Sequence, residues 1–318
     1  MRDYRFDVVR VVCMTYIVAY FHLYGYVYLQ GQPAIDTAIA HACLGLFTFV
    51  SGYLLGKKYC FGHEGNVDVW TFYKKRMLRI VPLFLISSVA LWLIGFNGAQ
   101  ATMNGLLCIS PFVNPRPGTM YYIPIILWCY LVTPLLSRHG LRWRVCGCVL
   151  LFGLLFIASL IFPSIDRRFV FNVFFYFVGI VSASCFDWRF TFPHGTSIKV
   201  FSVLFLVCLL AVSSHYSLLN TNLRQMALGG IGVFVILFIC EGISKLGGRQ
   251  FFNFVSYASM ACYLFHRFFY WVAEAVWNPT DTTIKWLYMA GVVYPIIIVL
   301  SYGIQKLYDK LVKKTNFM

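Results

Sequence analysis

Ten apolar stretches alternate with short polar segments along the chain, and each stretch is long enough to cross a bilayer. Continuous apolar runs of about 17 to 25 residues are typical of membrane-spanning helices, whereas membrane β-barrels show ~10-residue segments of alternating hydrophobicity. We therefore predict an all-α polytopic membrane protein, a single integral-membrane domain over residues 1–318 with short loops. Its spans are predicted near residues 8–29, 37–55, 78–96, 120–136, 145–162, 170–187, 199–214, 226–243, 253–276 and 286–304.

The composition agrees with a membrane protein, because 60% of the 318 residues are hydrophobic and only 12% are charged. The formal net charge of +15 comes from basic residues that crowd the ends of the apolar stretches, which favours membrane orientation over nucleic-acid binding as its explanation. The eleven cysteines form no CxxC pair, and most lie inside apolar runs. They are predicted to be reduced packing residues, with no metal site.

The lysines and arginines predict the orientation of the protein. When the N-terminus is assigned to the cytoplasm, 20 of them fall inside and five fall outside, with Arg267 left within a span. We therefore predict that both termini are cytoplasmic. The outside loop 97–119 is long, carries three prolines and little charge, and suits a lid or a half-inserted segment.

Two histidines lie near the middle of apolar runs, where ionisable side chains are costly and usually functional. Counted at ~1.5 Å per residue, His22 lies roughly 6 Å and His266 roughly 3 Å to the outer side of the midplane. The matched depth predicts a shared site in which an imidazole acts as a base or itself carries an acyl group. The alternative is that each histidine only bonds a neighbouring helix. His41 is a weaker third candidate, and the other histidines are expected in loops, namely His63, His139, His194 and His215.

Basic residues near the predicted inner ends of two spans are candidates for binding an anion. Arg10 follows Asp7 by three residues and is predicted to form an ion pair with it, with a snorkelling arginine as the alternative. Four cations within six residues open the third span, namely Lys74, Lys75, Arg76 and Arg79. Such a cluster binds either a phosphate-bearing ligand or anionic lipid headgroups. The nearby Ser51-Gly52-Tyr53 offers a hydroxyl and a small residue, although small residues commonly serve helix packing.

Five short motifs occur in order along nearly the whole chain. They are Asp7-Val8-Val9-Arg10 with the apolar run to Phe21-His22, Phe47-Thr48-Phe49-Val50-Ser51-Gly52-Tyr53-Leu54-Leu55, the segment from Phe72 to Pro82, Tyr121-Tyr122-Ile123-Pro124 through Tyr130 to Pro134-Leu135-Leu136, and Ser259-Met260-Ala261-Cys262-Tyr263-Leu264-Phe265-His266. Together they resemble the motifs of the acyltransferase type 3 family, integral-membrane O-acetyltransferases that modify bacterial surface sugars and related glycolipids.

The first motif departs from the usual pattern of that family. The family usually has ten residues between its arginine and histidine, whereas eleven separate Arg10 from His22. On an ideal helix, side chains eleven positions apart lie about 20° apart, and side chains twelve positions apart lie about 120° apart. The shared geometry therefore requires a π-bulge between Arg10 and His22 that absorbs the extra residue.

The resemblance implies an O-acyltransferase of the bacterial inner membrane that takes its acyl group from an acyl-CoA, expected to be acetyl-CoA, without a permanently bound cofactor. The expected acceptor is a hydroxyl of a cell-surface polysaccharide or lipid-linked sugar, and the lipid bilayer, not nucleic acid, is the surrounding partner. The expected catalytic residues are His22 and His266, and the expected donor-binding residues are Arg10, Ser51, Lys75, Arg76 and Arg79. Tyr257 and Tyr263 are candidate polar linings of the passage between them.

Two functions of other classes stay open. A glycolipid transporter or flippase would use the cations to hold a pyrophosphate, but the sequence contains no inverted pair of broken helices of the kind found in secondary transporters. A glycan polymerase would need a long external loop rich in charged residues, whereas the loop after Asn97 contains only Arg116.

Overall fold

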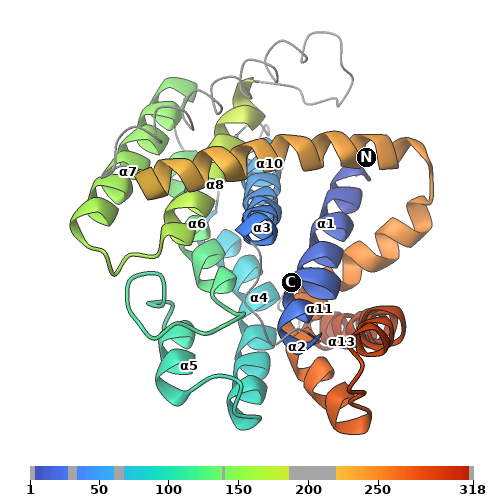
Figure 1. Ribbon diagram of the computed structural model, residues 1–318. Helices are drawn as coiled ribbons and strands as arrows, with labels where there is room; N and C mark the ends of the chain where they lie inside the picture. Colours follow the sequence, from blue (N-terminus) through green and yellow to red (C-terminus); the bar gives the residue numbers. More distant parts are fainter. Residues whose placement is uncertain (1–3, 28–33, 61–67, 138–139, 186–219, 315–318) are drawn as a thin grey trace.

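The computed structural model describes residues 4–27, 34–60, 68–137, 140–185 and 220–314, which form ten continuous helical segments and no strand (Figure 1). The first five are α1 (Arg5–Tyr16) continued by the π-helix η1 (Ile17–Phe21) and α2 (His22–Val27), α3 (Ala34–Leu55) continued by the π-helix η2 (Gly56–Cys60), α4 (Val69–Leu93), α5 (Ala99–Leu106) and α6 (Tyr122–Ser137). The other five are α7 (Leu141–Ile161), α8 (Arg167–Cys185), α10 (Asn220–Lys245), α11 (Arg249–Val276), and α12 (Thr282–Trp286) continued by the π-helix η3 (Leu287–Val293) and α13 (Tyr294–Lys314). The predicted all-α fold is confirmed for these residues.

Nine of the ten predicted spans overlap with helices of the structure, while the seventh, 199–214, lies outside the described residues. His63, His139, His194 and His215 also lie outside them. Five helical segments are long and apolar enough to cross a membrane, namely Arg5–Val27, Asp36–Tyr59, Val69–Leu93, Leu141–Ile161 and Thr282–Lys314. The protein is therefore a multi-pass membrane protein. The count of ten spans and the cytoplasmic position of both termini stay predictions.

Helix α4 begins at Val69 rather than near residue 78, where the apolar pattern placed the start of the third span. The carboxylate of Asp68 caps this end by accepting a hydrogen bond from the backbone N–H of Trp70 at 3.1 Å. Lysine and arginine are good helix formers, so the helix includes the cationic segment although that segment is too polar for a membrane span. The cations from Lys74 to Arg79 consequently lie on a rigid helix and not in a loop.

Two glycines bring α3 and α8 into close contact. A Cβ atom on Gly52 would lie 2.2 Å from the carbonyl oxygen of Tyr176, and one on Gly179 would lie 2.3 Å from the carbonyl oxygen of Phe49. Only hydrogen fits at either position, so the two backbones pack directly against each other. Helix packing therefore accounts for the glycine in Ser51-Gly52-Tyr53.

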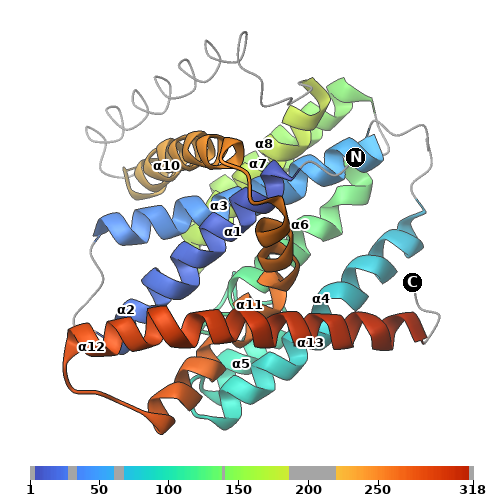
Figure 2. The same cartoon turned by 90° about the vertical axis from the view of Figure 1, so that its right-hand side faces the viewer.

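Two further long helical segments cross their neighbours. Helix α10 lies across α1, α3 and α8 (Figure 1), and the continuous helix α12–η3–α13 crosses α11 (Figure 2). A cluster of buried side chains joins α1, η1 and α2 to α11, η3 and α13, and it includes Val11, Met14, Val18, Leu23, Val255, Tyr270, Met289 and Ile297. This packing holds α2 against the middle of α11, and the two histidines meet at that contact.

Candidate active site

A π-helical turn lies between Arg10 and His22. The backbone N–H of His22 bonds to the carbonyl oxygen of Ile17, five residues earlier, at the end of η1. A turn with i→i+5 bonding holds one residue more than an α-helical turn. The eleven residues between the two side chains therefore act like ten residues of α-helix and leave Arg10 and His22 only about 20° apart around the axis. The π-bulge that the spacing required is present.

His22 at the start of α2 and His266 in α11 are in direct contact. Nδ1 of His22 lies 2.8 Å from Nε2 of His266, and the two ring planes are within 3° of parallel. Both side chains are buried, with 8% of His22 and none of His266 exposed. Two residues far apart in the sequence thus form one hydrogen-bonded pair inside the bundle.

The hydrogen bonds of this pair determine where its protons lie. Nδ1 of His266 is 2.8 Å from the carbonyl oxygen of Tyr263, and a carbonyl only accepts, so this nitrogen carries a hydrogen. Nε2 of a neutral His266 then accepts, and Nδ1 of His22 donates to it. Nε2 of His22 is left with an unprotonated lone pair, and none of the described residues forms a hydrogen bond with it. His22 is thereby arranged as a base, and His266 orients it.

Arg267 lies directly beside the pair, although the sequence left it only as a cation within a span. Its Nη1 donates to the carbonyl oxygen of His22 at 3.0 Å, and its Nε donates to the hydroxyl of Thr119 at 3.1 Å. Thr119 lies near the end of the loop between α5 and α6, and the hydroxyl of Tyr263 also donates to its carbonyl oxygen at 2.6 Å. The sequence signal that indicated this residue was an ionisable side chain next to His266 at membrane depth.

Arg10 forms the predicted ion pair with Asp7, whose Oδ1 lies 3.6 Å from its Nη1. The hydroxyl of Ser256 on α11 donates to the same carboxylate oxygen at 2.6 Å, which ties the first turns of α1 to α11. The Arg10 side chain stays 26% exposed. Arg10 therefore lies near the contact of α1 with α11, twelve residues before His22 on the same continuous helical segment.

Three of the four cations of α4 divide between two environments, and the fourth, Lys74, is half-buried. Lys75 and Arg79 are exposed on the helix surface. Arg76 instead turns inward, with its guanidinium 5.9 Å from the Phe72 ring and 5.6 Å from the Tyr130 ring on α6. Its Nε is buried without a hydrogen-bond partner among the described residues. A buried donor of this kind favours an acceptor oxygen, so Arg76 is the member of the cluster best placed to bind a ligand inside the bundle.

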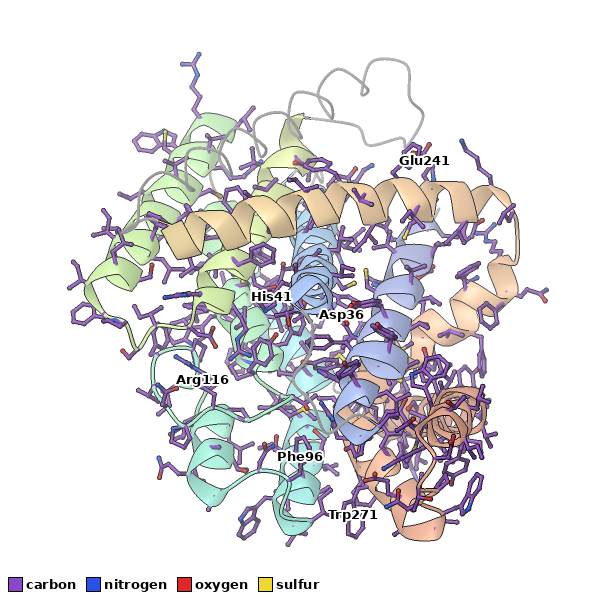
Figure 3. The ribbon with its side chains drawn as sticks, viewed as in Figure 1. Asp36, His41, Phe96, Arg116, Glu241 and Trp271 are labelled. Carbon is purple, nitrogen blue, oxygen red and sulfur yellow. The ribbon has the colours of Figure 1, made fainter. Side chains whose placement is uncertain are left out.

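The other candidate residues are dispersed. His41 on α3 lies against Phe171 of α8, with ring centroids 6.3 Å apart (Figure 3). Tyr263 lies beside His266, with ring centroids 6.1 Å apart. Tyr257 instead donates to Asp309 at 2.5 Å and lines a surface cavity of about 460 Å³ between α11 and α13. Ser51 is half-buried on α3, one residue before the glycine that packs on α8. Of these four residues, only Tyr263 reaches the histidine pair.

The fold and the site define a multi-pass membrane protein with a buried pair of hydrogen-bonded histidines and a cationic helix end. The family model of an acyltransferase domain matches residues 3–306, essentially the whole chain. The chain therefore belongs to the acyltransferase 3 family, as its motifs indicated, and is a membrane acyltransferase. No curated protein and no solved structure matches it.

Proposed function

We propose that this protein transfers an acetyl group from cytoplasmic acetyl-CoA to a hydroxyl of a cell-surface polysaccharide or lipid-linked sugar in the bacterial inner membrane. The observation that carries this proposal is the hydrogen-bonded chain from Tyr263 through His266 to His22, which leaves Nε2 of His22 free to accept a proton. An O-acyltransferase needs such a group, because the acceptor hydroxyl is a weak nucleophile until a base takes its proton.

The donor is held by the cations of α4 and by Arg10. The phosphates of coenzyme A bind Lys75 and Arg79 on the exposed side of the helix and Arg76 on its inner side, where a fork of N–H groups matches phosphate oxygens. The thin pantetheine arm then runs past Arg10 and Tyr122 toward the histidine pair. Ser51 contributes at most a hydroxyl on the flank of this path.

The chemistry at His22 balances without a further reactant. Nε2 of His22 takes the proton of the acceptor hydroxyl as the hydroxyl oxygen attacks the thioester carbonyl carbon. The new C–O bond forms and the carbonyl π electrons move onto the carbonyl oxygen. When these electrons return, the C–S bond breaks, and the sulfur of coenzyme A leaves with the proton from His22. His266 is a positioning residue, because it orients the His22 ring through Nδ1 and touches no reacting atom.

The two other functions receive less support. A transporter that grips a pyrophosphate needs cations but no proton-accepting histidine, and the chain belongs to a family of acyltransferases. The loop around α5 does not support a glycan polymerase, because its cation Arg116 is used within the protein. Arg116 donates to the backbone carbonyl of Ser110 at 3.1 Å and lies 3.4 Å from the Asp166 carboxylate.

Acetyl transfer by the purified protein tests the proposal. Wild-type protein with labelled acetyl-CoA and the native acceptor glycan should form a labelled ester, and His22→Ala should lower the rate typically 10²- to 10⁴-fold. His22→Gln should be as inactive as the alanine variant, because an amide replaces a hydrogen bond but does not take up a proton near neutral pH.

The half-buried His41, which packs on Phe171 away from the pair, provides the control. His41→Gln should keep its activity. Substantial transfer by His22→Gln would assign that histidine to helix packing, and the absence of any ester from wild-type protein would refute the acyltransfer itself.

The orientation is tested separately. A single accessible cysteine at Asn114 or Asp281 should react with an impermeant reagent in intact cells, because both positions lie in predicted outside loops. Labelling only after permeabilisation would reverse the proposed topology, and with it the side from which the donor approaches.

A further inference from the structure

Arg267 carries a charge that the described residues do not neutralise. Its guanidinium bonds the carbonyl oxygen of His22 at 3.0 Å and the hydroxyl of Thr119 at 3.1 Å, and both partners are neutral. No carboxylate in the described part of the chain forms an ion pair with it. Glu274, the one acid on α11, pairs with Lys285 at 2.7 Å. A positive charge is therefore held beside the histidine pair without a counter-ion from the part of the chain that the structure describes.

The surroundings of this charge stabilise it only in part. The rings of Tyr26 and Phe96 lie 5.1 Å and 5.2 Å from the guanidinium carbon of Arg267, with Phe96 in the turn after α4 (Figure 3). Cation–π contacts offset some of the cost of desolvating a guanidinium, but an ionisable group at membrane depth stays expensive. A substrate group that brings negative charge to this position would be strongly stabilised.

Acyl transfer generates such a group next to His22. When the acceptor oxygen adds to the thioester carbonyl, the carbonyl oxygen becomes an oxyanion that needs hydrogen-bond donors. Many enzymes supply backbone N–H groups from a loop, but His22 and His266 lie inside helices, where backbone N–H groups are used in helical hydrogen bonds. A side-chain donor is therefore required here. A guanidinium has five N–H groups, and the bonds to His22 and Thr119 use two of those of Arg267.

We infer that Arg267 is a catalytic residue that binds the acyl carbonyl oxygen and stabilises the oxyanion formed beside His22. This inference rests on the proposed acyl transfer. The C–O bond forms as the proton passes to Nε2 of His22, and the carbonyl π electrons become a lone pair on the oxygen that faces Arg267. The same electrons re-form the carbonyl as the C–S bond breaks, so the charge of Arg267 is compensated only in the tetrahedral intermediate and the transition states on either side of it.

Steady-state kinetics of Arg267→Met and Arg267→Lys test this inference. Removing one oxyanion donor costs about 10²- to 10³-fold in kcat, so the methionine variant should lose this much while the KM values for acetyl-CoA and acceptor change less than about threefold. The lysine variant should recover part of the loss, because it keeps the charge but not the fork. Hydrolysis of acetyl-CoA without acceptor should fall in parallel, since water attack passes through the same oxyanion.

Two controls separate catalysis from structure. Thr119→Val removes the bond to Nε of Arg267 and keeps the charge, so it should cost less than about tenfold in kcat. Arg116→Gln removes an arginine of the loop between α5 and α6, away from the histidine pair, and should leave kcat near wild type.

A raised KM for the acceptor with unchanged kcat and hydrolysis would assign Arg267 to a phosphate or another anion on the acceptor and overturn the inference. Equal losses of kcat in Arg267→Met and Thr119→Val, with a matching fall in melting temperature, would show that Arg267 only stabilises the loop, and would overturn the inference. Wild-type protein without acetyl transfer would refute both proposals, whereas a fully active Arg267→Met variant would refute only this one.

Discussion

The π-helical turn η1 sets the orientation of His22, and single-residue changes in its length test this role. Deleting Ala19, which lies within η1, leaves ten residues between Arg10 and His22. A regular α-helix accommodates that spacing with the two side chains about 20° apart. Inserting one alanine after Ala19 adds a position that η1 does not absorb, and so turns α2 by about 100° relative to α1.

The size of the displacement follows from helix geometry. For a ring about 5 Å from the helix axis, half the diameter of a helix with its side chains, a rotation of about 100° moves His22 by about 8 Å. Its Nδ1 lies 2.8 Å from Nε2 of His266, so the inserted residue separates the pair. The deletion keeps the pair together, and the π-turn reverts to α-helix.

Acetyl transfer in membranes and detergent melting of the purified variants measure the outcome. We expect the deletion variant to melt within a few degrees of wild type and to keep most of its activity, and the insertion variant to be as inactive as His22→Ala. Wild-type activity in the insertion variant, or a well-folded deletion variant without activity, would refute the reasoning that η1 absorbs the extra residue.

Three further predictions concern the fold and the donor site. Gly52→Ala should lower the melting temperature and destabilise the fold by about 1–3 kcal/mol, because the added Cβ would lie 2.2 Å from the carbonyl oxygen of Tyr176. The control Gly153→Ala, with nothing within 4 Å of the added carbon, should be neutral or stabilising. Equal melting temperatures of the two variants would contradict the close packing of α3 on α8. Burial raises the pKa of Asp166, but hydrogen bonds and charge from Arg168 outweigh this effect and hold the pKa below its ordinary value. Asp166→Asn should therefore lower the free energy of unfolding by about 1.5–3 kcal/mol at neutral pH, and the difference from wild type should shrink as the pH falls through the lowered pKa. Equal melting temperatures of variant and wild type at neutral pH would contradict this prediction. Arg76→Ala should weaken acetyl-CoA binding roughly ten- to a hundred-fold, with partial recovery in Arg76→Lys. Unchanged affinity in the alanine variant would indicate that this residue contacts lipid headgroups instead.

The level of a residue along a helix is a local property of the chain, and the sequence predicted that His22 and His266 lie at the same level. Each residue advances a helix by ~1.5 Å, so counting from the ends of the spans placed His22 and His266 at similar depth, and the structure has them in contact at 2.8 Å. The same counting showed that eleven residues after Arg10 required a π-bulge, and η1 supplies it. The ion pair of Asp7 with Arg10 is likewise a matter of helical spacing.

Hydropathy was a poorer guide to the length of α4. The apolar pattern reports where a helix lies in lipid, and it does not report where the backbone hydrogen bonds of that helix begin. The capping carboxylate of Asp68 starts α4 at Val69, well before its apolar part. The helix therefore includes Lys74, Lys75 and Arg76, which precede the apolar span predicted from residue 78.

Lateral position was decided only by the tertiary structure. Which face of a helix meets which neighbour depends on the packing of side chains from distant parts of the chain, and the uniformly apolar surface of a membrane helix gives no pattern that identifies the inner face. Arg76 turns toward Tyr130 while Arg79 stays exposed, and His41 meets Phe171 instead of the other histidines. Arg267 was visible in the sequence as a cation at membrane depth, but its place beside His22 depends on how α2, α11 and the loop that contains Thr119 pack together.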